Sequence, residues 1–242
     1  MTATQSTTLR SIALAQPATI RVFERFHLDY CCGGNRSLAD ACAQKALDIE
    51  TVLTALAEAV SAAEPANDFT QATPTALIRH IVQTHHAYVR AELPRLLTLS
   101  EKVAAKHGPA HPEYIQIERH LLQLDGELIN HLTKEEIVLF PYIEALEKSR
   151  NGQGPVPHAC FPTVESPIKA MLNEHEVAGG LLEEMRSSTQ GFTPPTGACP
   201  TLAGLLDGID AFEKDLHRHV HLENNLLFPL AIAMEKEVMV AQ

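Results

Sequence analysis

Several features are scarce or missing in this chain of 242 residues. It contains no tryptophan, aromatic residues make up 5% of it, and stretches that alternate apolar and polar residues as a β-strand does are nearly absent. It has no run of 18 apolar residues, which argues against a membrane-spanning helix. It also has no basic run, and its net charge is −11, so we expect no nucleic-acid partner and no membrane partner.

A secretion signal is missing as well. The first residues, MTATQSTTLRS, lack the apolar core of a signal peptide, so we expect a cytoplasmic protein. The five cysteines follow no disulfide framework and are expected to be reduced thiols. Cys31 and Cys32, in the stretch LDYCCGGNRS, are adjacent, and neighbouring cysteines cannot form a disulfide without strain.

Signals for helix starts and ends are abundant. Ser37 and Asp48 are suited to cap two short helices, the second ending near Ala63. The polar stretch AEPANDFTQATP, in the region of residues 64–75, is typical of a linker. Beyond it, loops rich in glycine and proline separate four amphipathic segments, at about residues 74–105, 112–148, 165–188 and 200–238.

These signals predict an all-α protein. We expect a small helical N-terminal domain at residues 1–66 and a four-helix bundle at residues 67–242. A helical domain of roughly 60 residues is near the lower limit of independent stability, so the small domain is expected to dock on the bundle.

The bundle segment contains an internal repeat. HLTKEEIVLFP begins at His131 and HVHLENNLLFP begins at His219, and both follow the pattern H-x-x-x-E-x-x-x-L-F-P. A lone histidine precedes each copy: His86 lies 45 residues before His131, and His175 lies 44 residues before His219. The spacing indicates a duplicated pair of helices.

Helical periodicity places these residues on apolar stripes. In the last segment the stripe is Leu202, Leu205, Ile209, Phe212, Leu216, His219, Glu223, Leu226 and Leu230. In the second it is Leu121, Leu124, Leu128, His131, Glu135, Val138 and Tyr142. The third gives Ile168, Met171, His175, Gly179 and Leu182, and the first gives Ile78, Val82, His86, Val89, Leu93 and Leu96.

The stripes also separate candidate ligands from their neighbours. His217 and His221 fall off the stripe of the last segment. His86 fits its stripe slightly better than His85, whose stripe meets Glu92 instead of Leu93, so spacing alone leaves His85 as a rival.

Four histidines and two glutamates therefore point inward, and this set predicts a metal site. One histidine on an apolar face is usually a core residue with a hydrogen-bond partner, but a buried carboxylate without a partner costs several kcal/mol. No lysine or arginine occupies the stripes near Glu135 and Glu223. Two metal ions, each taking two histidines and sharing both carboxylates, satisfy all six groups. Imidazole and carboxylate ligands suit iron or manganese and tolerate zinc, and we expect two bridged irons.

The motifs DYCCGG, HLTKEEIVLFP and HVHLENNLLFP together resemble the family of repair-of-iron-centres (RIC) proteins, also called the ScdA/YtfE family. The resemblance covers nearly the whole chain and implies a hemerythrin-like di-iron bundle. The iron ligands of the family fall here on the six residues that the stripes select: His86, His131, Glu135, His175, His219 and Glu223. It also implies carboxylates on the approach to the irons, at Glu127 and Glu174. For Glu174, a solvated surface residue is the alternative that spacing leaves open.

The resemblance further implies a function. Proteins of this family help to restore iron–sulfur clusters damaged by nitric oxide or peroxide, and they bind nitric oxide at the di-iron centre, so damaged iron–sulfur proteins and a small gas are the expected partners. One alternative is an enzyme that reduces nitric oxide to nitrous oxide. Another is a scavenger or sensor that only binds nitric oxide or oxygen. A homodimer is compatible with all three.

The cysteine pair favours the first interpretation, because a pure scavenger has no need of it. The helix expected to begin near Ser37 points its N-terminus toward Cys31 and Cys32, which favours thiolates suited to accept iron or pass electrons. Simple packing is the alternative, since free cysteines are often buried. We expect the pair to face the bundle near Glu127 and Glu174. Cys42 is expected to pack inside a helix, and Cys160 and Cys199 are assigned no role.

Overall fold

The computed structural model describes residues 3–62 and 69–240. These residues form helices and connecting turns, and within them the only β-type pairing is an isolated bridge between Thr8 and Ser37. The prediction of an all-α protein is confirmed.

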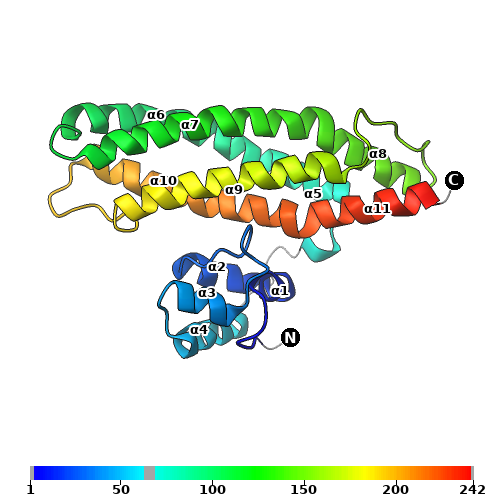
Figure 1. The fold of residues 1–242 in the computed structure, drawn as a ribbon, viewed down its shortest axis with the longest axis horizontal. Coiled ribbons are helices and arrows are strands. Elements are labelled where there is room, and N and C mark those ends of the chain that lie inside the picture. Colours follow the sequence, from blue (N-terminus) through cyan, green and yellow to red (C-terminus); the bar gives the residue numbers. More distant parts are fainter. Residues whose placement is uncertain (1–2, 63–68, 241–242) are drawn as a thin grey trace.

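Four long helical rods form the larger part of the molecule (Figure 1). The first rod consists of α5 (Pro74–Ile81), η3 (Val82–His86) and α6 (Ala87–His107), and the second of α7 (Pro112–Lys134), η4 (Glu135–Leu139) and α8 (Phe140–Arg150). The third is α9 (Glu165–Ser188), and the fourth consists of α10 (Pro200–Leu222), η5 (Glu223–Leu227) and α11 (Phe228–Val240). Proline at the first position of α5, α7 and α10 suits helix starts, because the missing N–H would be unpaired there anyway.

The N-terminal segment folds into short helices beneath this bundle (Figure 1). They are α1 (Leu9–Ala15), η1 (Pro17–Thr19), α2 (Ile20–Arg25), α3 (Leu38–Gln44) and α4 (Ile49–Ser61). The side chains of Ser37 and Asp48 accept the expected capping bonds, at 3.1 Å from Asp40 N and 2.9 Å from Thr51 N. The short helices enclose an apolar core of their own around Phe23 and Tyr30. The first half of the expected linker, residues 63–68, lies outside the described residues, and η2 (Phe69–Gln71) forms within its second half.

Three of the four rods contain one turn of π-helix, at η3, η4 and η5. A π-turn inserts an extra residue into an α-helix, so the buried face moves by one position beyond it. Val138, expected inside, is 39% exposed, and Leu139 is buried instead. Leu226 is likewise only half-buried, and Leu227 occupies the core. The stripe predictions were therefore wrong at Val138 and Leu226, whereas Tyr142 is buried as expected.

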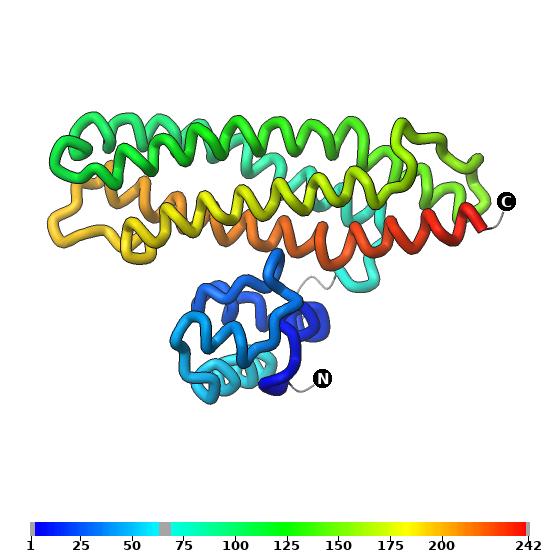
Figure 2. Tube along the Cα trace, in the orientation of Figure 1, coloured from blue at the N-terminus to red at the C-terminus, as the bar shows by residue number. Residues whose placement is uncertain are grey.

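Specific contacts hold the N-terminal helices against the bundle. Glu24 accepts two hydrogen bonds from Arg218 on α10, at 2.6 and 2.8 Å. Asn225 Nδ2 donates to the carbonyl oxygen of Tyr30 at 3.2 Å. The loop between α2 and α3 projects toward the bundle (Figure 2), and Cys31 in this loop packs into the main core of the bundle. The expected docking is confirmed.

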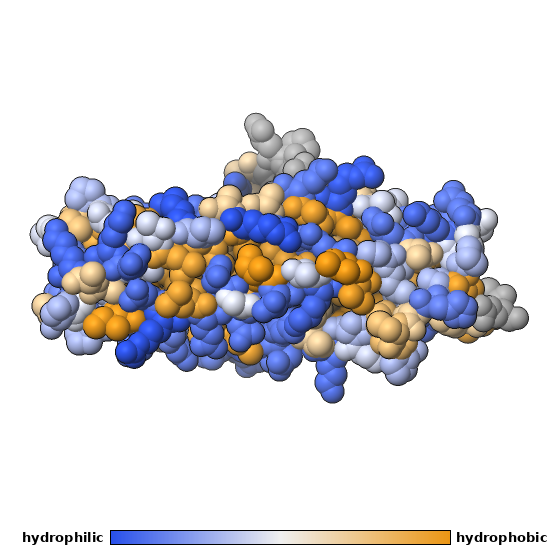
Figure 3. Space-filling model, turned by 90° about the horizontal axis from the view of Figure 1, so that it is seen from above, coloured by the Kyte–Doolittle hydropathy of each residue, from blue (hydrophilic) through white to orange (hydrophobic). Residues whose placement is uncertain are grey.

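Part of the bundle surface is apolar. Hydrophobic side chains reach the surface in the middle of the face seen from above (Figure 3). Large apolar residues that are substantially exposed include Leu122 (57%) on α7 and Ile137 (70%) on η4. None of the described helices is long and apolar enough to cross a membrane.

Candidate metal centre

The six inward-pointing residues meet in the middle of the bundle. His86 comes from the first rod, His131 and Glu135 from the second, His175 from the third, and His219 and Glu223 from the fourth. All six side chains are buried, with exposures of 0 to 2%. They form two groups that could each hold a metal ion, His86–Glu135–His219–Glu223 and His131–Glu135–His175–Glu223.

The histidines face each other in pairs. Nε2 of His86 lies 3.1 Å from Nε2 of His219, and Nε2 of His131 lies 3.0 Å from Nε2 of His175. Two imidazole nitrogens directed at one point are arranged as two ligands of a single cation.

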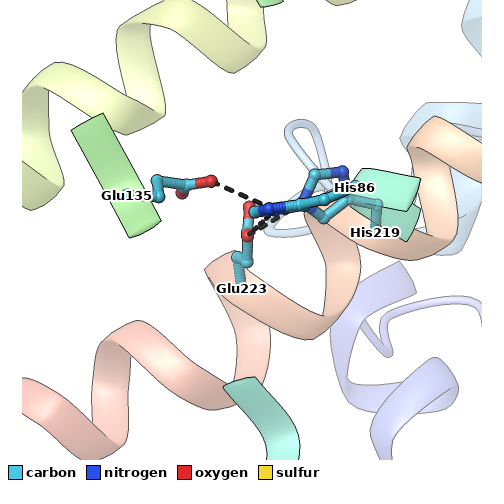
Figure 4. A group of neighbouring side chains, drawn as sticks. All are labelled: His86, Glu135, His219 and Glu223. Atoms are coloured by element: carbon cyan, nitrogen blue, oxygen red, sulfur yellow. Dashed lines mark hydrogen bonds and ion pairs between the residues drawn. The ribbon is translucent and has the colours of Figure 1, made fainter. Parts of the chain in front are cut away.

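The glutamates connect the two pairs. Glu135 Oε2 lies 3.4 Å from Nε2 of His86 and 3.4 Å from Nε2 of His131. Glu223 places Oε1 at 2.9 Å from Nε2 of His219 and Oε2 at 3.2 Å from Nε2 of His175. Figure 4 shows both carboxylates pointing toward the ring nitrogens of His86 and His219. Each carboxylate is therefore shared by both groups, as a bridging ligand would be.

The π-turns place these side chains. His86 is the last residue of η3, and Glu135 and Glu223 are the first residues of η4 and η5. Ile81 and His86, five residues apart across η3, are both fully buried. The structure thus places His86, and not its rival His85, in the group with Glu135 and His219.

The neighbouring histidines have other partners. His85 Nδ1 lies 3.0 Å from Asp215 Oδ1. His221 is buried against the N-terminal helices, with its ring 5.3 Å from that of Tyr30, and burial lowers its pKa to about 4. The ring of His217 lies at the edge of the same Tyr30 ring. All three lie outside the two groups, as the stripe analysis predicted for His217 and His221.

Three of the four histidines of the centre have a hydrogen-bond partner at Nδ1, on the side of the ring that faces away from the centre. His86 Nδ1 lies 2.7 Å from Glu136 Oε1, His131 Nδ1 lies 2.9 Å from Glu174 Oε2, and His175 Nδ1 lies 2.9 Å from Asn224 Oδ1. An oxygen acceptor at Nδ1 keeps the proton on that nitrogen and leaves Nε2 free to bind a metal. Sequence reasoning missed Glu136 and Asn224, although each directly follows a glutamate of the repeat.

The burial of so many polar groups shifts their pKa values. Burial and the nearby Glu223 raise the pKa of Glu135 to about 8. Burial also opposes ionisation of Glu223, but the adjacent imidazoles of His219 and His175 hold its pKa well below its usual value. Burial opposes protonation of His86, yet the adjacent carboxylates of Glu135 and Glu223 raise its pKa to about 10. In each of these groups burial opposes the charged form, and the charges of the neighbouring side chains decide the direction of the pKa shift.

The donor atoms fit two metal ions. Both carboxylate oxygens of Glu135 and Oε2 of Glu223 are buried without a well-formed hydrogen bond, although imidazole nitrogens lie 3.2 to 3.4 Å away. A buried carboxylate oxygen that hydrogen bonds leave unsatisfied is a costly arrangement in an apolar core. A cation at each histidine pair would satisfy these oxygens.

Comparisons with known proteins agree with this geometry. Residues 77–231 match the model of the hemerythrin HHE cation-binding domain, and residues 5–60 match a domain of unknown function, DUF542. The chain is 35% identical over 227 residues to the iron-sulfur cluster repair protein YtfE of Dickeya chrysanthemi, covering 94% of this chain and 97% of the relative. It is 37% identical over 230 residues to YtfE of Escherichia coli O157:H7, with the same coverage.

The chain belongs to the YtfE family. The family resemblance inferred from the sequence motifs is confirmed, and so is a hemerythrin-like bundle with buried clusters that could bind metal ions.

The two carboxylates expected on the approach to the metals lie in different environments. Glu174 on α9 bonds His131 and also accepts a hydrogen bond from Lys134. Burial opposes its ionisation, but Lys134 and His131 keep its pKa below the usual value. It is therefore not a freely solvated residue. Glu127 lies on the exposed side of α7, one turn before His131, and its role in the YtfE-like site stays a prediction.

Cys31 and Cys32 occupy a tight turn organised by Asp29. The Asp29 carboxylate accepts hydrogen bonds from the backbone N–H groups of Cys31, Cys32 and Gly33, at 3.1, 2.9 and 2.7 Å. Glycine is required at Gly34, where a Cβ atom would lie 2.5 Å from the carbonyl oxygen of Tyr30.

The thiol of Cys31 is not in the state that we expected. Its Sγ donates to Asp29 Oδ1 at 3.2 Å, the side chain is buried, and all five cysteines of the chain are free. The hydrogen bond with Cys32, burial and the Asp29 charge raise the pKa of Cys31 well above its usual value. The expectation of a thiolate at Cys31 is wrong, because the contact with Cys32, burial and the Asp29 carboxylate all favour the neutral thiol.

The cysteine pair borders a cavity of about 420 Å³ between the N-terminal helices and the bundle. On the bundle side, residues of α9 and α10 line the cavity, among them His175, Gly179 and Val220. The pair therefore faces the bundle on the side of the His175 cluster. Neither Glu127 nor Glu174 lines this cavity, so the cysteine pair does not lie next to these two carboxylates as we expected.

Proposed function

We propose that this chain binds two iron ions at the six-residue centre and helps to restore damaged iron–sulfur clusters in other proteins. The observation that carries the proposal is the pair of buried histidine clusters that share both carboxylates. The curated relatives, which the chain matches over almost its full length, carry the name iron-sulfur cluster repair protein.

In this proposal His86 and His219 would hold one ion, and His131 and His175 would hold the other. Glu135 and Glu223 would contribute carboxylate oxygens to both ions, and a small molecule such as nitric oxide would bind beside these protein ligands. When bound, such an iron pair supplies redox chemistry and an exchangeable pool of iron. The protein contributes a dry cavity and three pre-oriented imidazoles, through Glu136, Glu174 and Asn224.

We further propose that Cys31 and Cys32 act between the cavity and the metal centre. Cys32 is the less buried of the two, and His175, one of the proposed metal ligands, lines the same cavity. A thiol pair at this position is suited to pass iron or electrons between the centre and a partner. Asp29 completes the only group in the described chain, outside the bundle, that could also hold a cation.

An assay of cluster repair tests the proposal. An iron–sulfur enzyme is inactivated with nitric oxide, and its recovery is followed with and without the iron-loaded protein. We expect faster recovery with the intact protein and little effect of a Glu135→Ala, Glu223→Ala double variant. Glu127→Gln, on the exposed side of α7, should show whether that carboxylate contributes. Equal recovery with and without the protein would contradict a repair function.

The same experiment addresses the alternative of a nitric oxide reductase. Nitrous oxide and released iron are quantified after nitric oxide is added anaerobically to the reduced protein. Iron release without stoichiometric nitrous oxide supports repair by iron donation. Repeated formation of nitrous oxide with both irons retained would instead support the reductase. We also propose a cytoplasmic location, and the exposed apolar residues of α7 and η4 make a homodimer a reasonable assembly to test.

A further inference from the structure

The two histidine pairs of the centre are related by the internal repeat, but their outer partners are not the same. His131 and His175 both have an oxygen acceptor at Nδ1, from Glu174 and Asn224. In the other pair, His86 has Glu136, whereas Nδ1 of His219 is buried and has no hydrogen-bond partner among the described residues.

The repeat shows what is missing. Glu174, which bonds His131, directly precedes His175. The corresponding residue in the first half directly precedes His86, and this residue is His85. Where one half of the bundle supplies a carboxylate, the other half supplies an imidazole.

His85 contacts His219 in a different way. The two rings are parallel, with an interplanar angle of 2° and centroids 5.6 Å apart. Asp215, one helical turn before His219 on α10, fixes His85 through the 3.0 Å contact between Oδ1 and Nδ1. Ring packing restrains the orientation of the His219 imidazole, but it does not provide an acceptor for a proton on Nδ1.

This difference affects metal binding directly. For Nε2 of a neutral histidine to bind a metal, the ring proton must sit on Nδ1. In His86, His131 and His175 an oxygen already faces that proton. In His219 the Nε2 atom contacts Glu223 Oε1 at 2.9 Å, and a proton moved to Nδ1 would be a buried, unpaired donor.

We infer that the two metal positions are unequal and that the ion held by His86 and His219 is released first. The inference rests on the proposed function and deepens it, because it identifies which of the two irons the protein can donate. Loss of an outer hydrogen-bond partner of a ligating histidine typically weakens metal binding by about 10- to 100-fold. We therefore expect release rates that differ by about tenfold or more.

Iron release from the full-length protein tests this inference. The metal-free protein is loaded anaerobically with two equivalents of ferrous iron and mixed with an excess of a ferrous chelator, and the coloured chelate is followed with time. We expect two phases of equal amplitude. A single phase from a protein that holds two irons would overturn the inference while leaving the di-iron proposal intact. Binding of fewer than two irons would refute the di-iron proposal itself, and with it the inference.

Variants assign the phases. His85→Glu together with Asp215→Asn places a carboxylate at the position equivalent to Glu174 and avoids a clash of two negative charges. We expect the fast phase to slow by about tenfold and merge with the slow one. The matched control, Gln83→Glu with Asp215→Asn, adds the same charge on the exposed side of η3 and should leave the fast phase fast.

A second variant keeps the inference testable if the first does not fold. Glu174→Gln weakens the acceptor of His131, so the slow phase should accelerate and the fast phase should remain unchanged. Acceleration of the fast phase alone would show that His131 and His175 hold the ion that is released first, and it would overturn the inference.

Discussion

Replacing Glu135 with glutamine should stabilise the metal-free protein and, at the same time, weaken its hold on metal. Glu135 is fully buried, and its pKa is raised from the usual 4.5 to about 8, first by burial and then by Glu223. At pH 7 the unfolded chain carries this group ionised, whereas the folded metal-free protein keeps it largely protonated. Each pH unit between 4.5 and 7 adds about 1.4 kcal/mol to the cost of that protonation, which reaches roughly 3 kcal/mol.

The sign of the pH dependence follows from the raised pKa. The cost is absent below pH 4.5, grows as the pH rises from 4.5 to 8, and is constant above 8. Glutamine has nearly the same shape and does not ionise. We therefore expect Glu135→Gln to increase the free energy of unfolding of the metal-free protein by about 1 to 3 kcal/mol at pH 7, and by less than about 1 kcal/mol at pH 5.

Denaturant unfolding of the metal-free wild type and variant at the two pH values measures this difference. Glu127→Gln makes the same chemical change on the exposed side of α7 and should alter the stability at neither pH. In the presence of iron the order should reverse, because a neutral amide is a poor bridging ligand. A variant that is less stable than wild type without metal, or equally able to retain iron, would refute the reasoning.

Three further outcomes are expected. His219→Ala should lose metal and His217→Ala should retain it, as metal analysis of the purified variants can show, because only the ring of His219 points into the centre. Replacing both Cys31 and Cys32 with serine should leave the iron content unchanged but slow the recovery of a damaged iron–sulfur enzyme. Full recovery with this variant would show that the two cysteines only pack in the interior. Alkylation at neutral pH, mapped by mass spectrometry, should modify Cys199 faster than Cys31. Backbone N–H groups at the start of α10 lower the pKa of Cys199, whereas a hydrogen bond and burial raise the pKa of Cys31.

Much of the fold could be predicted because it depends on local signals. Proline at helix starts, the capping residues Ser37 and Asp48, and apolar stripes at helical spacing define the elements and the bundle. The six candidate ligands stand out for a related reason: a histidine or glutamate that interrupts an apolar stripe twice at the same spacing is hard to explain as core packing.

The parts that failed depend on the backbone or on contacts between helices. A π-turn carries no clear sequence signal, so the position of Leu139 in the core, in place of Val138, could not be foreseen. Glu136 looks like a surface residue of its own helix, and only the arrangement of the rods brings it to His86. The pKa of Cys31 depends on how the turn closes around Asp29, which a helix-dipole argument ignores.

The metal content of the purified protein tests the central claim most directly. The full-length chain is produced with ample iron, purified without oxygen, and its iron and zinc are counted per chain, beside a Glu135→Ala, Glu223→Ala double variant. We expect two irons per chain in the wild type and clearly fewer in the variant, because four histidines alone must then hold two cations. One zinc and no iron in the wild type, or two irons retained by the double variant, would contradict a di-iron centre bridged by these glutamates.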